Sequence, residues 1–226
     1  MPATDQHLRQ RLCQQAERRG LDLSDAQVDA LMGYLELVLQ ARAHLNLTGL
    51  RDPERILDVL IVESLDFCRP DLILGDGRVL DLGTGAGVPG ITLAVWGAGL
   101  HLTLLDRTQK KIAFVRRAAL SLDLYNCHPA WGSAEELAHR LPPDERFDAV
   151  VARGVGSVAH LMRLARPLLR PHGKLLLRKP PAGAEHREAE ALLASPAWAG
   201  MRTYPLPESG AKPWILVALE RSTDTG

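Results

Sequence analysis

The chain has 226 residues, 46% of them hydrophobic, which allows one large domain, or a domain with an appendage, around a sizeable core. The 27 basic and 27 acidic side chains cancel, and this balance excludes a strong overall attraction to nucleic acid, so RNA binding would need a local basic face. The first twenty residues are too polar for a secretory signal, no apolar run reaches the roughly 18 residues of a membrane span, and the three cysteines are widely separated, so we expect a cytoplasmic protein with no membrane contact.

The first 70 residues are predicted to be helical. Apolar side chains recur every four positions through residues 4–20, as on one face of a helix. Ser24 and Gln27 form a capping box ahead of a second periodic run, and an Asp-Pro pair at 52–53 marks a third helix start. Because this stretch carries no strand signal, we expect residues 1–70 to form a helical N-terminal region, either a cap on a sheet or a small subdomain.

From residue 78 the pattern changes to alternating strands and helices. Strands are predicted at 78–83, 101–106, 127–131, 147–152 and 174–179, helices at 89–97, 108–122, 133–140, 157–169 and 184–194, and a closing antiparallel hairpin at 201–206 and 214–219. Such alternation is typical of an α/β fold, in which helices cover both faces of a mostly parallel sheet. We assign residues 71–226 to this domain, which could also form one compact unit with residues 1–70, and we expect a monomer.

The stretch VLDLGTGAGVPG at 79–90 predicts a strand, a glycine turn and the start of a helix. Asp81 lies inside the apolar run, and Gly83, Gly85 and Gly87 alternate with small residues after it. Glycines let the backbone approach a ligand closely, because no Cβ stands in the way. The turn follows the carboxyl end of a strand, which is where open α/β sheets bind ligands.

The spacing of this turn excludes two common ligands. A dinucleotide fingerprint needs G-x-G-x-x-G, but its third glycine position holds Val88. A P-loop needs a lysine, and none lies between Arg78 and Lys110. What is present is D-x-G-x-G-x-G, followed by Asp106 at the end of the next predicted strand, where a carboxylate can accept both hydroxyls of a ribose. This combination resembles the class I S-adenosylmethionine methyltransferases, which implies a Rossmann-like sheet and S-adenosylmethionine as the cofactor.

Two further sites follow predicted strands. Ala134 and Glu135 come just after the third strand, where enzymes of this class contact adenine; alternatively, Glu135 only stabilises the first turn of its helix through the helix dipole. Arg153 comes just after the fourth strand, where it could face the methionine end of the cofactor or the substrate, or remain a solvated surface arginine.

The match extends beyond the glycine turn. It includes NLT at 46–48, RDP at 51–53, ESL at 63–65, LLDRTQKKIAFVRRA at 104–118, AEEL at 134–137 and VARGV at 151–155. Together these segments resemble the bacterial glucose-inhibited-division B family of small-subunit rRNA guanine-N7 methyltransferases, over about residues 25–220. The resemblance implies methylation of N7 of a guanine in 16S rRNA, with the rRNA or a ribosomal particle as the partner.

The glycine turn and the resemblance together predict the residues of the site. The predicted cofactor-binding residues are Asp81, Gly83, Thr84, Gly85, Gly87, Val88, Asp106, Ala134, Glu135 and Arg153. Arg153 and Lys179 are also candidate substrate contacts.

The sequence departs from the family on the predicted substrate side. Leu60 and Glu63 stand where histidine and aspartate are usual, and Gly154 and Pro180 stand where alanine and glycine are usual. Two alternatives therefore stay open. One is a methyltransferase of this fold with a small-molecule or different RNA acceptor, and the other is a cofactor-binding module without turnover.

Transfer to N7 requires no catalytic base, because this nitrogen carries an unprotonated lone pair at neutral pH. Alignment of the reactants can itself supply about 7 to 11 kcal/mol, so we predict no catalytic residue. The sequence shows no Ser/His/Asp or Cys/His arrangement, and its eight histidines lack metal-ligand spacing, so we expect no metal site.

RNA would be held by two groups of basic residues. The first group is Arg107, Lys110, Lys111, Arg116 and Arg117, and the second is Arg163, Arg166, Arg170, Lys174, Arg178 and Lys179. Phosphate contacts from such groups position an RNA and weaken with salt, although Arg116 and Arg117 could equally form a solvated helix face. Trp131 and Trp214 are candidates for base stacking, with core or edge packing as the alternative.

Overall fold

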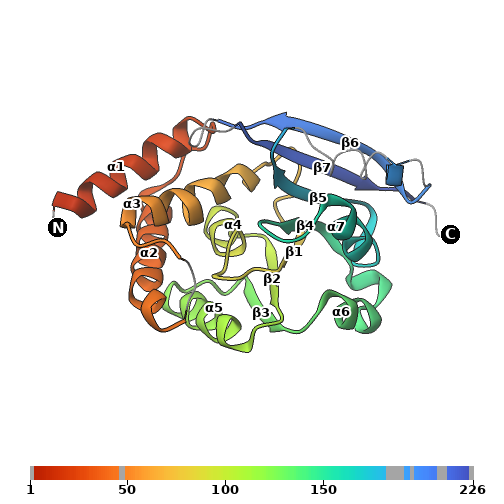
Figure 1. The fold of residues 1–226 in the computed structure, drawn as a ribbon, viewed down its shortest axis with the longest axis horizontal. Coiled ribbons are helices and arrows are strands. Elements are labelled where there is room, and N and C mark those ends of the chain that lie inside the picture. The colour runs from red at the N-terminus through yellow and green to blue at the C-terminus, as the bar shows by residue number, and fades with distance from the viewer. Residues whose placement is uncertain (1–2, 46–48, 182–190, 194–195, 208–212, 224–226) are drawn as a thin grey trace.

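The computed structural model describes residues 3–45, 49–181, 191–193, 196–207 and 213–223, and the strands within them form one seven-stranded sheet (Figure 1). The strands are β1 (Arg78–Leu82), β2 (His101–Asp106), β3 (Cys127–Trp131), β4 (Phe147–Ala152), β5 (Leu169–Lys179), β6 (Trp198–Pro205) and β7 (Ile215–Arg221). β1 to β5 pair in parallel, whereas β7 lies antiparallel between β5 and β6. The predicted α/β fold and its closing hairpin are confirmed.

The order of the strands, β3-β2-β1-β4-β5-β7-β6, places a reversal beside β1. The chain moves outward from β1 through β2 to β3, and then returns to the other side of β1 with β4. The register pairs Leu82 with Leu105 and Asp106 with Trp131, so the carboxyl ends of β1, β2 and β3 lie together at one edge. Open α/β sheets bind ligands in the crevice at such a reversal.

Helices cover both faces of the sheet. They are α1 (Ala3–Glu17), α2 (Asp25–Leu45), α3 (Pro53–Ile56), a π-helical turn η1 (Leu57–Ile61), 3₁₀ segments η2 (Val62–Phe67) and η3 (Pro143–Glu145), α4 (Gly90–Trp96), α5 (Gln109–Ser121), α6 (Ala134–Arg140) and α7 (Val158–Ala165). Figure 1 shows α1 to α5 on one side of the strands and α6 and α7 on the other. Side chains alternate along β1, so Val79 packs with the first group of helices, and Leu80 and Leu82 pack with the second. Within the described residues, no helix combines the length and apolarity that crossing a membrane would need.

Local capping chemistry starts several of these helices where the sequence predicts. The Ser24 backbone N–H donates to Gln27 Oε1 at 2.9 Å, and the Ser133 N–H donates likewise to Glu136 Oε2 at 2.9 Å, so both capping boxes are present. Asp52 Oδ2 accepts a hydrogen bond from the Arg55 N–H at 3.0 Å and caps α3.

The boundary between α7 and β5 differs from the prediction. The predicted helix at 157–169 ends at Ala165, and β5 begins at Leu169 rather than at residue 174. Pro167 explains the early end, because a proline has no N–H to donate to the Arg163 carbonyl one helical turn before it. The predicted helix at 184–194 falls largely outside the described residues, of which 191–193 are helical, and the NLT segment at 46–48 also lies outside them.

The N-terminal helices share one hydrophobic core with the sheet. Leu8, Leu12 and Ala16 of α1 belong to the same buried cluster as Val79 of β1 and Leu104 of β2. We propose that residues 1–70 and 71–226 fold as one cooperative unit, because neither part would keep this core if the other unfolded.

Leu12→Ala tests this proposal. Leu12 is fully buried, so its truncation should cost about 2–5 kcal/mol of the free energy of unfolding. All four tryptophans lie beyond residue 90, so their fluorescence reports the sheet domain, whereas far-UV circular dichroism reports all the helices. In urea, both signals should shift together to lower denaturant. Leu120→Ala, at a side chain 72% exposed, is the control. A fluorescence transition that stays in place while the dichroism transition moves would contradict a single unit.

Candidate functional site

A cavity of about 470 Å³ opens at the carboxyl edge of the sheet, where the strand order reverses. It is lined by Leu60, Leu82, Gly83, Thr84, Gly85, Ala86, Val88, Leu105, Asp106, Arg107, Lys111, Gly132, Ser133, Ala134, Arg153, Gly154, Val155, His160 and Leu164. Seven of the predicted cofactor-binding residues are in this lining: Gly83, Thr84, Gly85, Val88, Asp106, Ala134 and Arg153. Asp81, Gly87 and Glu135 are not part of it.

Two glycines of the turn need their left-handed backbone for different reasons. Gly83 has a φ of +75°, and a Cβ there would lie 2.7 Å from Cγ2 of Val155, so the loop after β4 can approach only a glycine. Gly85 has a φ of +59°, but the nearest heavy atom to a Cβ there would be 3.9 Å away. The space beside Gly85 is therefore open, and it forms part of the cavity.

Asp81 closes the glycine turn. Its Oδ2 accepts hydrogen bonds from Thr84 Oγ1 at 2.6 Å and from the Gly90 backbone N–H at 2.8 Å. One carboxylate oxygen thus connects β1 both to Thr84, in the glycine turn, and to Gly90, the first residue of α4. The hydrogen bonds of Asp81 show that it shapes the turn. Its side chain is fully buried and outside the cavity lining, and direct contact with a cofactor stays a prediction.

This carboxylate is in an unfavourable environment for a charge. Burial raises the pKa of Asp81 from 3.8 to about 6, and the hydrogen bonds from Thr84 and Gly90 offset only part of that rise. Its Oδ1 has no hydrogen-bond partner in the described part of the chain.

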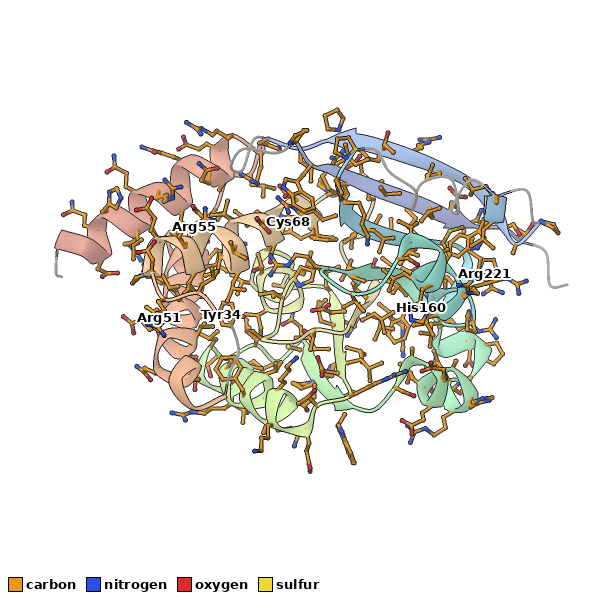
Figure 2. The ribbon with its side chains drawn as sticks, in the orientation of Figure 1. Tyr34, Arg51, Arg55, Cys68, His160 and Arg221 are labelled. Atoms are coloured by element: carbon orange, nitrogen blue, oxygen red, sulfur yellow. The ribbon has the colours of Figure 1, made fainter. Side chains whose placement is uncertain are left out.

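Tyr34 supports the turn from α2, and its role was not predicted. The hydroxyl of this fully buried side chain donates to the Ala86 carbonyl at 2.7 Å (Figure 2). Tyr34 belongs to the apolar stripe of α2 with Leu31, Leu35 and Val38, which hides its role. The usable signal was the hydroxyl itself, since a buried tyrosine needs a hydrogen-bond partner.

Asp106 joins the turn to the end of β2. Its Oδ2 accepts from the Gly85 N–H at 2.9 Å, and its Oδ1 accepts from the Thr108 N–H at 2.8 Å. Thr108 is the N-cap residue of α5, but its side chain makes no capping hydrogen bond, and Asp106 binds its backbone instead. Each carboxylate oxygen has a further lone pair, so Asp106 keeps acceptor capacity towards the cavity.

Ala134 and Glu135 both lie in the first turn of α6, but their side chains have different surroundings. Ala134 is buried and lines the cavity, whereas the exposed Glu135 carboxylate accepts from Arg107 Nη2 at 2.8 and 3.0 Å. Hydrogen bonds from its own backbone N–H and from Arg107 lower the pKa of Glu135. The structure therefore places the Glu135 side chain against Arg107, at the outer margin of the site.

Arg153 lies in the cavity lining with only 12% of its side chain exposed. Its Nη1 donates to the Val59 carbonyl and lies 3.6 Å from Glu63 Oε2. Burial lowers the pKa of Arg153, while Glu63 acts in the opposite direction. Leu60 also lines the cavity, and Lys179 Nζ donates to the Gly156 carbonyl at 2.8 Å, in the loop that follows Arg153.

The predicted RNA-binding groups are only partly on the surface. Lys110, Arg116 and Arg117 are exposed along α5. Arg178 is buried, with 3% of its side chain exposed and ion pairs to Asp66 and Glu63, so the prediction that it contacts RNA is wrong. Its position on β5 explains the error, because it shares the buried face of Leu176.

The remaining members of the second group are dispersed. Arg170 pairs with Asp148 at 2.7 Å, near the amino end of β4 and away from the cavity.

The two candidates for base stacking differ in exposure. Trp131 is 61% exposed, with its indole N–H donating to the Arg107 carbonyl at 3.0 Å, whereas the Trp214 ring packs 4.2 Å from the Arg178 guanidinium. The described residues hold no group of three or more metal-ligating side chains.

Asp81→Asn tests the electrostatic environment of the turn. Between about pH 4 and pH 6 the folded protein binds more protons at Asp81 than the unfolded chain does, so the free energy of unfolding should fall as the pH rises through this window. The shift corresponds to about 3 kcal/mol at 1.36 kcal/mol per unit. Urea unfolding from pH 4 to 7 should show a steeper fall in the native protein than in Asp81→Asn, whose amide oxygen can keep both hydrogen bonds. Parallel pH profiles would contradict the raised pKa.

Comparisons with known proteins identify the family. A family model described as GidB, rRNA small subunit methyltransferase G, matches residues 27–212. The chain is 38% identical to the ribosomal RNA small subunit methyltransferase G of Deinococcus deserti over 77% of this chain and 71% of that protein, and 36% identical to that of Burkholderia cenocepacia over 76% and 75%. An O-methyltransferase from Bacillus cereus in complex with SAH has the same fold, with a TM-score of 0.61 at 17% identity over 83% of this chain and 90% of that chain. The chain belongs to the rRNA small subunit methyltransferase G family.

Proposed function

We propose that the protein transfers a methyl group from S-adenosylmethionine to N7 of a guanine in small-subunit (16S) rRNA. The observation that carries the proposal is the cavity, in which the glycine turn and Asp106 face the same space in a chain of this family. The finer assignment, guanine N7, comes from the family resemblance and from the chemistry of the lining.

The lining fits S-adenosylmethionine. A volume of about 470 Å³ is within the usual range for a small-molecule site. The open space at Gly85 lets a ligand lie against the backbone, and Asp106 offers two carboxylate oxygens for ribose hydroxyls. Ala134 provides a buried apolar surface for adenine, and Arg153 is at the opposite side of the turn, next to β4. When bound, the cofactor would supply an activated methyl group.

The residues around the cavity act by holding and orienting. Guanine N7 attacks through a lone pair that is already free, so no side chain has to remove a proton. The glycine turn is fixed on three sides by Asp81, Asp106 and Tyr34, which leaves it little freedom to move when a ligand arrives. Such alignment, in a site formed before binding, is the main source of rate that this reaction requires.

The surface beside the cavity suits an RNA. Lys111 lines the cavity, and Lys110, Arg116 and Arg117 are exposed along the same helix, where phosphates could neutralise them. Trp131 is the last residue of β3 and presents an exposed indole next to Gly132, which is in the lining. Base stacking on such a ring is tolerant of sequence, so it would assist binding without selecting the target.

Gly85→Leu tests the cofactor site, with Gly20→Leu as the matched control. Both glycines have a left-handed φ, +59° and +70°, and both have room for a Cβ, so the backbone cost of about 1–2 kcal/mol should be similar. Only Gly85 lines the cavity. Calorimetry with S-adenosylmethionine should detect no binding to Gly85→Leu and native affinity for Gly20→Leu. Native affinity in both variants would contradict a cofactor site beside Gly85 and would show that S-adenosylmethionine binds elsewhere on the protein.

The acceptor is tested by mapping transferred label. The protein is incubated with methyl-labelled S-adenosylmethionine and with either 16S rRNA or small ribosomal subunits that lack the modification. We expect label on N7 of a guanine. Methylation at N7 makes the RNA strand cleavable at that nucleotide by treatment with borohydride and then aniline. Label at another RNA position would replace the proposed acceptor. Tight cofactor binding with no label in either RNA would favour a small-molecule acceptor or a module without turnover.

A further inference from the structure

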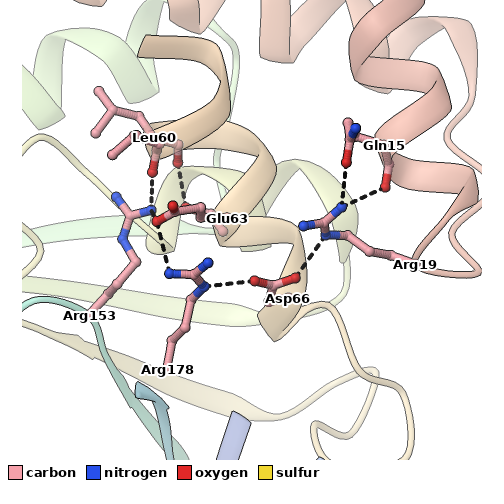
Figure 3. Close-up of polar contacts among 9 residues, drawn as sticks. Gln15, Arg19, Leu60, Glu63, Asp66, Arg153 and Arg178 are labelled. Atoms are coloured by element: carbon pink, nitrogen blue, oxygen red, sulfur yellow. Dashed lines mark hydrogen bonds and ion pairs between the residues drawn. The ribbon is translucent and has the colours of Figure 1, made fainter. Parts of the chain in front are cut away.

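Five side chains of alternating charge, the first three buried and the last two partly exposed, connect the end of α1 to Arg153 in the cavity lining (Figure 3). We call Arg19, Asp66, Arg178, Glu63 and Arg153, in this order, the buried ion-pair chain. Arg19 Nε donates to Asp66 Oδ1 at 2.8 Å, and Arg178 Nε donates to Asp66 Oδ2 at 2.9 Å. Arg178 Nη1 lies 3.1 Å from Glu63 Oε2, and Arg153 Nη1 lies 3.6 Å from the same oxygen.

The five side chains come from four separate parts of the fold. Arg19 follows α1, Glu63 and Asp66 lie in η2, Arg178 is on β5, and Arg153 follows β4. Asp66 and Arg178 are 112 residues apart in sequence. The exposed fractions of the side chains are 3% for Arg19, 0% for Asp66 and 3% for Arg178, and they rise to 19% for Glu63 and 12% for Arg153. The chain of charges therefore begins deep in the protein and reaches open space only at its Arg153 end.

Burial makes the geometry of this chain strict. Removing charged groups from water is costly unless each meets a close partner of opposite charge. Asp66 uses one oxygen for each of two arginines, and Arg178 uses separate nitrogens for two acids. A movement of Glu63 would thus disturb Arg178 as well as Arg153. The buried ion pair with Arg178 therefore restrains the Glu63 carboxylate.

Arg153 depends on Glu63 and on the irregular helix beside it. The guanidinium lies between the Val59 carbonyl, in the π-helical turn η1, and the Glu63 carboxylate in η2. Such π turns are frequent at functional sites. An arginine on a loop has many rotamers, and these two partners select the one in the cavity lining.

We propose that Glu63, held by Arg178, is a positioning residue that fixes the Arg153 guanidinium in the cavity. The proposal rests on the proposed function, because it assigns Glu63 to the same site. It distinguishes the Glu63 end of the chain from the Arg19–Asp66 end, which joins α1 to η2 and whose contribution is to the stability of the fold.

A double-mutant cycle tests whether Glu63 acts through Arg153. The cycle compares the native protein, Glu63→Gln, Arg153→Gln and the double variant, each at a temperature where circular dichroism shows it folded. Calorimetry gives the Kd for S-adenosylmethionine, and label transfer to the small subunit gives kcat and KM. Glu63→Gln should change the same parameter as Arg153→Gln, by roughly 10- to 100-fold, because a misplacement of about 1 Å can cost that much. The double variant should be no worse than Arg153→Gln alone.

Asp58→Asn is the matched control. Asp58 lies in η1, pairs with Arg11 of α1 through two hydrogen bonds of 2.8 Å, and has the same 19% side-chain exposure as Glu63. Its partner Arg11 does not line the cavity, whereas Arg153, the partner of Glu63, does. Its replacement should lower the melting temperature and leave Kd and kcat unchanged. An equal loss of binding or rate in Asp58→Asn would show that Glu63→Gln acts through stability, and would overturn the proposal.

The other outcomes are also decisive. The proposal that Glu63 positions Arg153 would be overturned if the effects of the two substitutions multiply in the double variant. It would also be overturned if Arg153→Gln has the native Kd and kcat. If the native protein methylates no offered acceptor, the proposed function fails, and the cycle is then decided by the Kd alone, where coupled losses support positioning and a native Kd in Glu63→Gln overturns it. If the native protein binds no S-adenosylmethionine, both proposals fall together.

Discussion

The hydrogen bonds to a single oxygen of Asp81 hold the site together. Thr84 Oγ1 and the Gly90 N–H both donate to Oδ2, so the two ends of the glycine turn are tied to the end of β1. Asp106 binds the middle of the turn at Gly85, and Tyr34 binds it at Ala86 from the opposite side. The turn is consequently held in one conformation by side chains of the protein itself.

This arrangement has an electrostatic cost, and the buried ion-pair chain offsets part of it. The chain contains three guanidinium groups and two carboxylates, so one positive charge is left over when both acids are ionised. Its Arg153 end lowers the pKa of Asp81, against the larger effect of burial. Asp81 and the buried ion-pair chain therefore stabilise each other's charged forms. Because the chain ends at the cavity, the N-terminal helix α1 is connected to the site through charge as well as through hydrophobic packing.

Local features of the site could be predicted from the sequence, whereas its long-range contacts could not. The strand-turn-helix at 79–90, the position of Asp106 and both capping boxes depend on residues close together in the chain, where spacing determines which groups can meet. Tyr34 and Ala86 are 52 residues apart, and Arg153 and Val59 are 94 apart. Nothing in the sequence pairs them, because their meeting depends on how η1 and α2 pack against the strands. Arg178 shows a middle case: it directly follows the continuous apolar run Leu175–Leu177 of β5, which is buried, but its charge suggested the surface.

The departures from the family have different consequences for the cavity. Glu63 keeps a carboxylate where the family resemblance implies aspartate, and in this chain that carboxylate is engaged with Arg178 and Arg153. Leu60 lines the cavity where the family resemblance implies a histidine, and His160 is the histidine that the lining retains. A hydroxyl or amine acceptor generally has to lose a proton during methyl transfer, and a histidine in the lining would be the natural group to take it. Guanine N7 has no proton to lose, so an apolar side chain at position 60 is compatible with this acceptor.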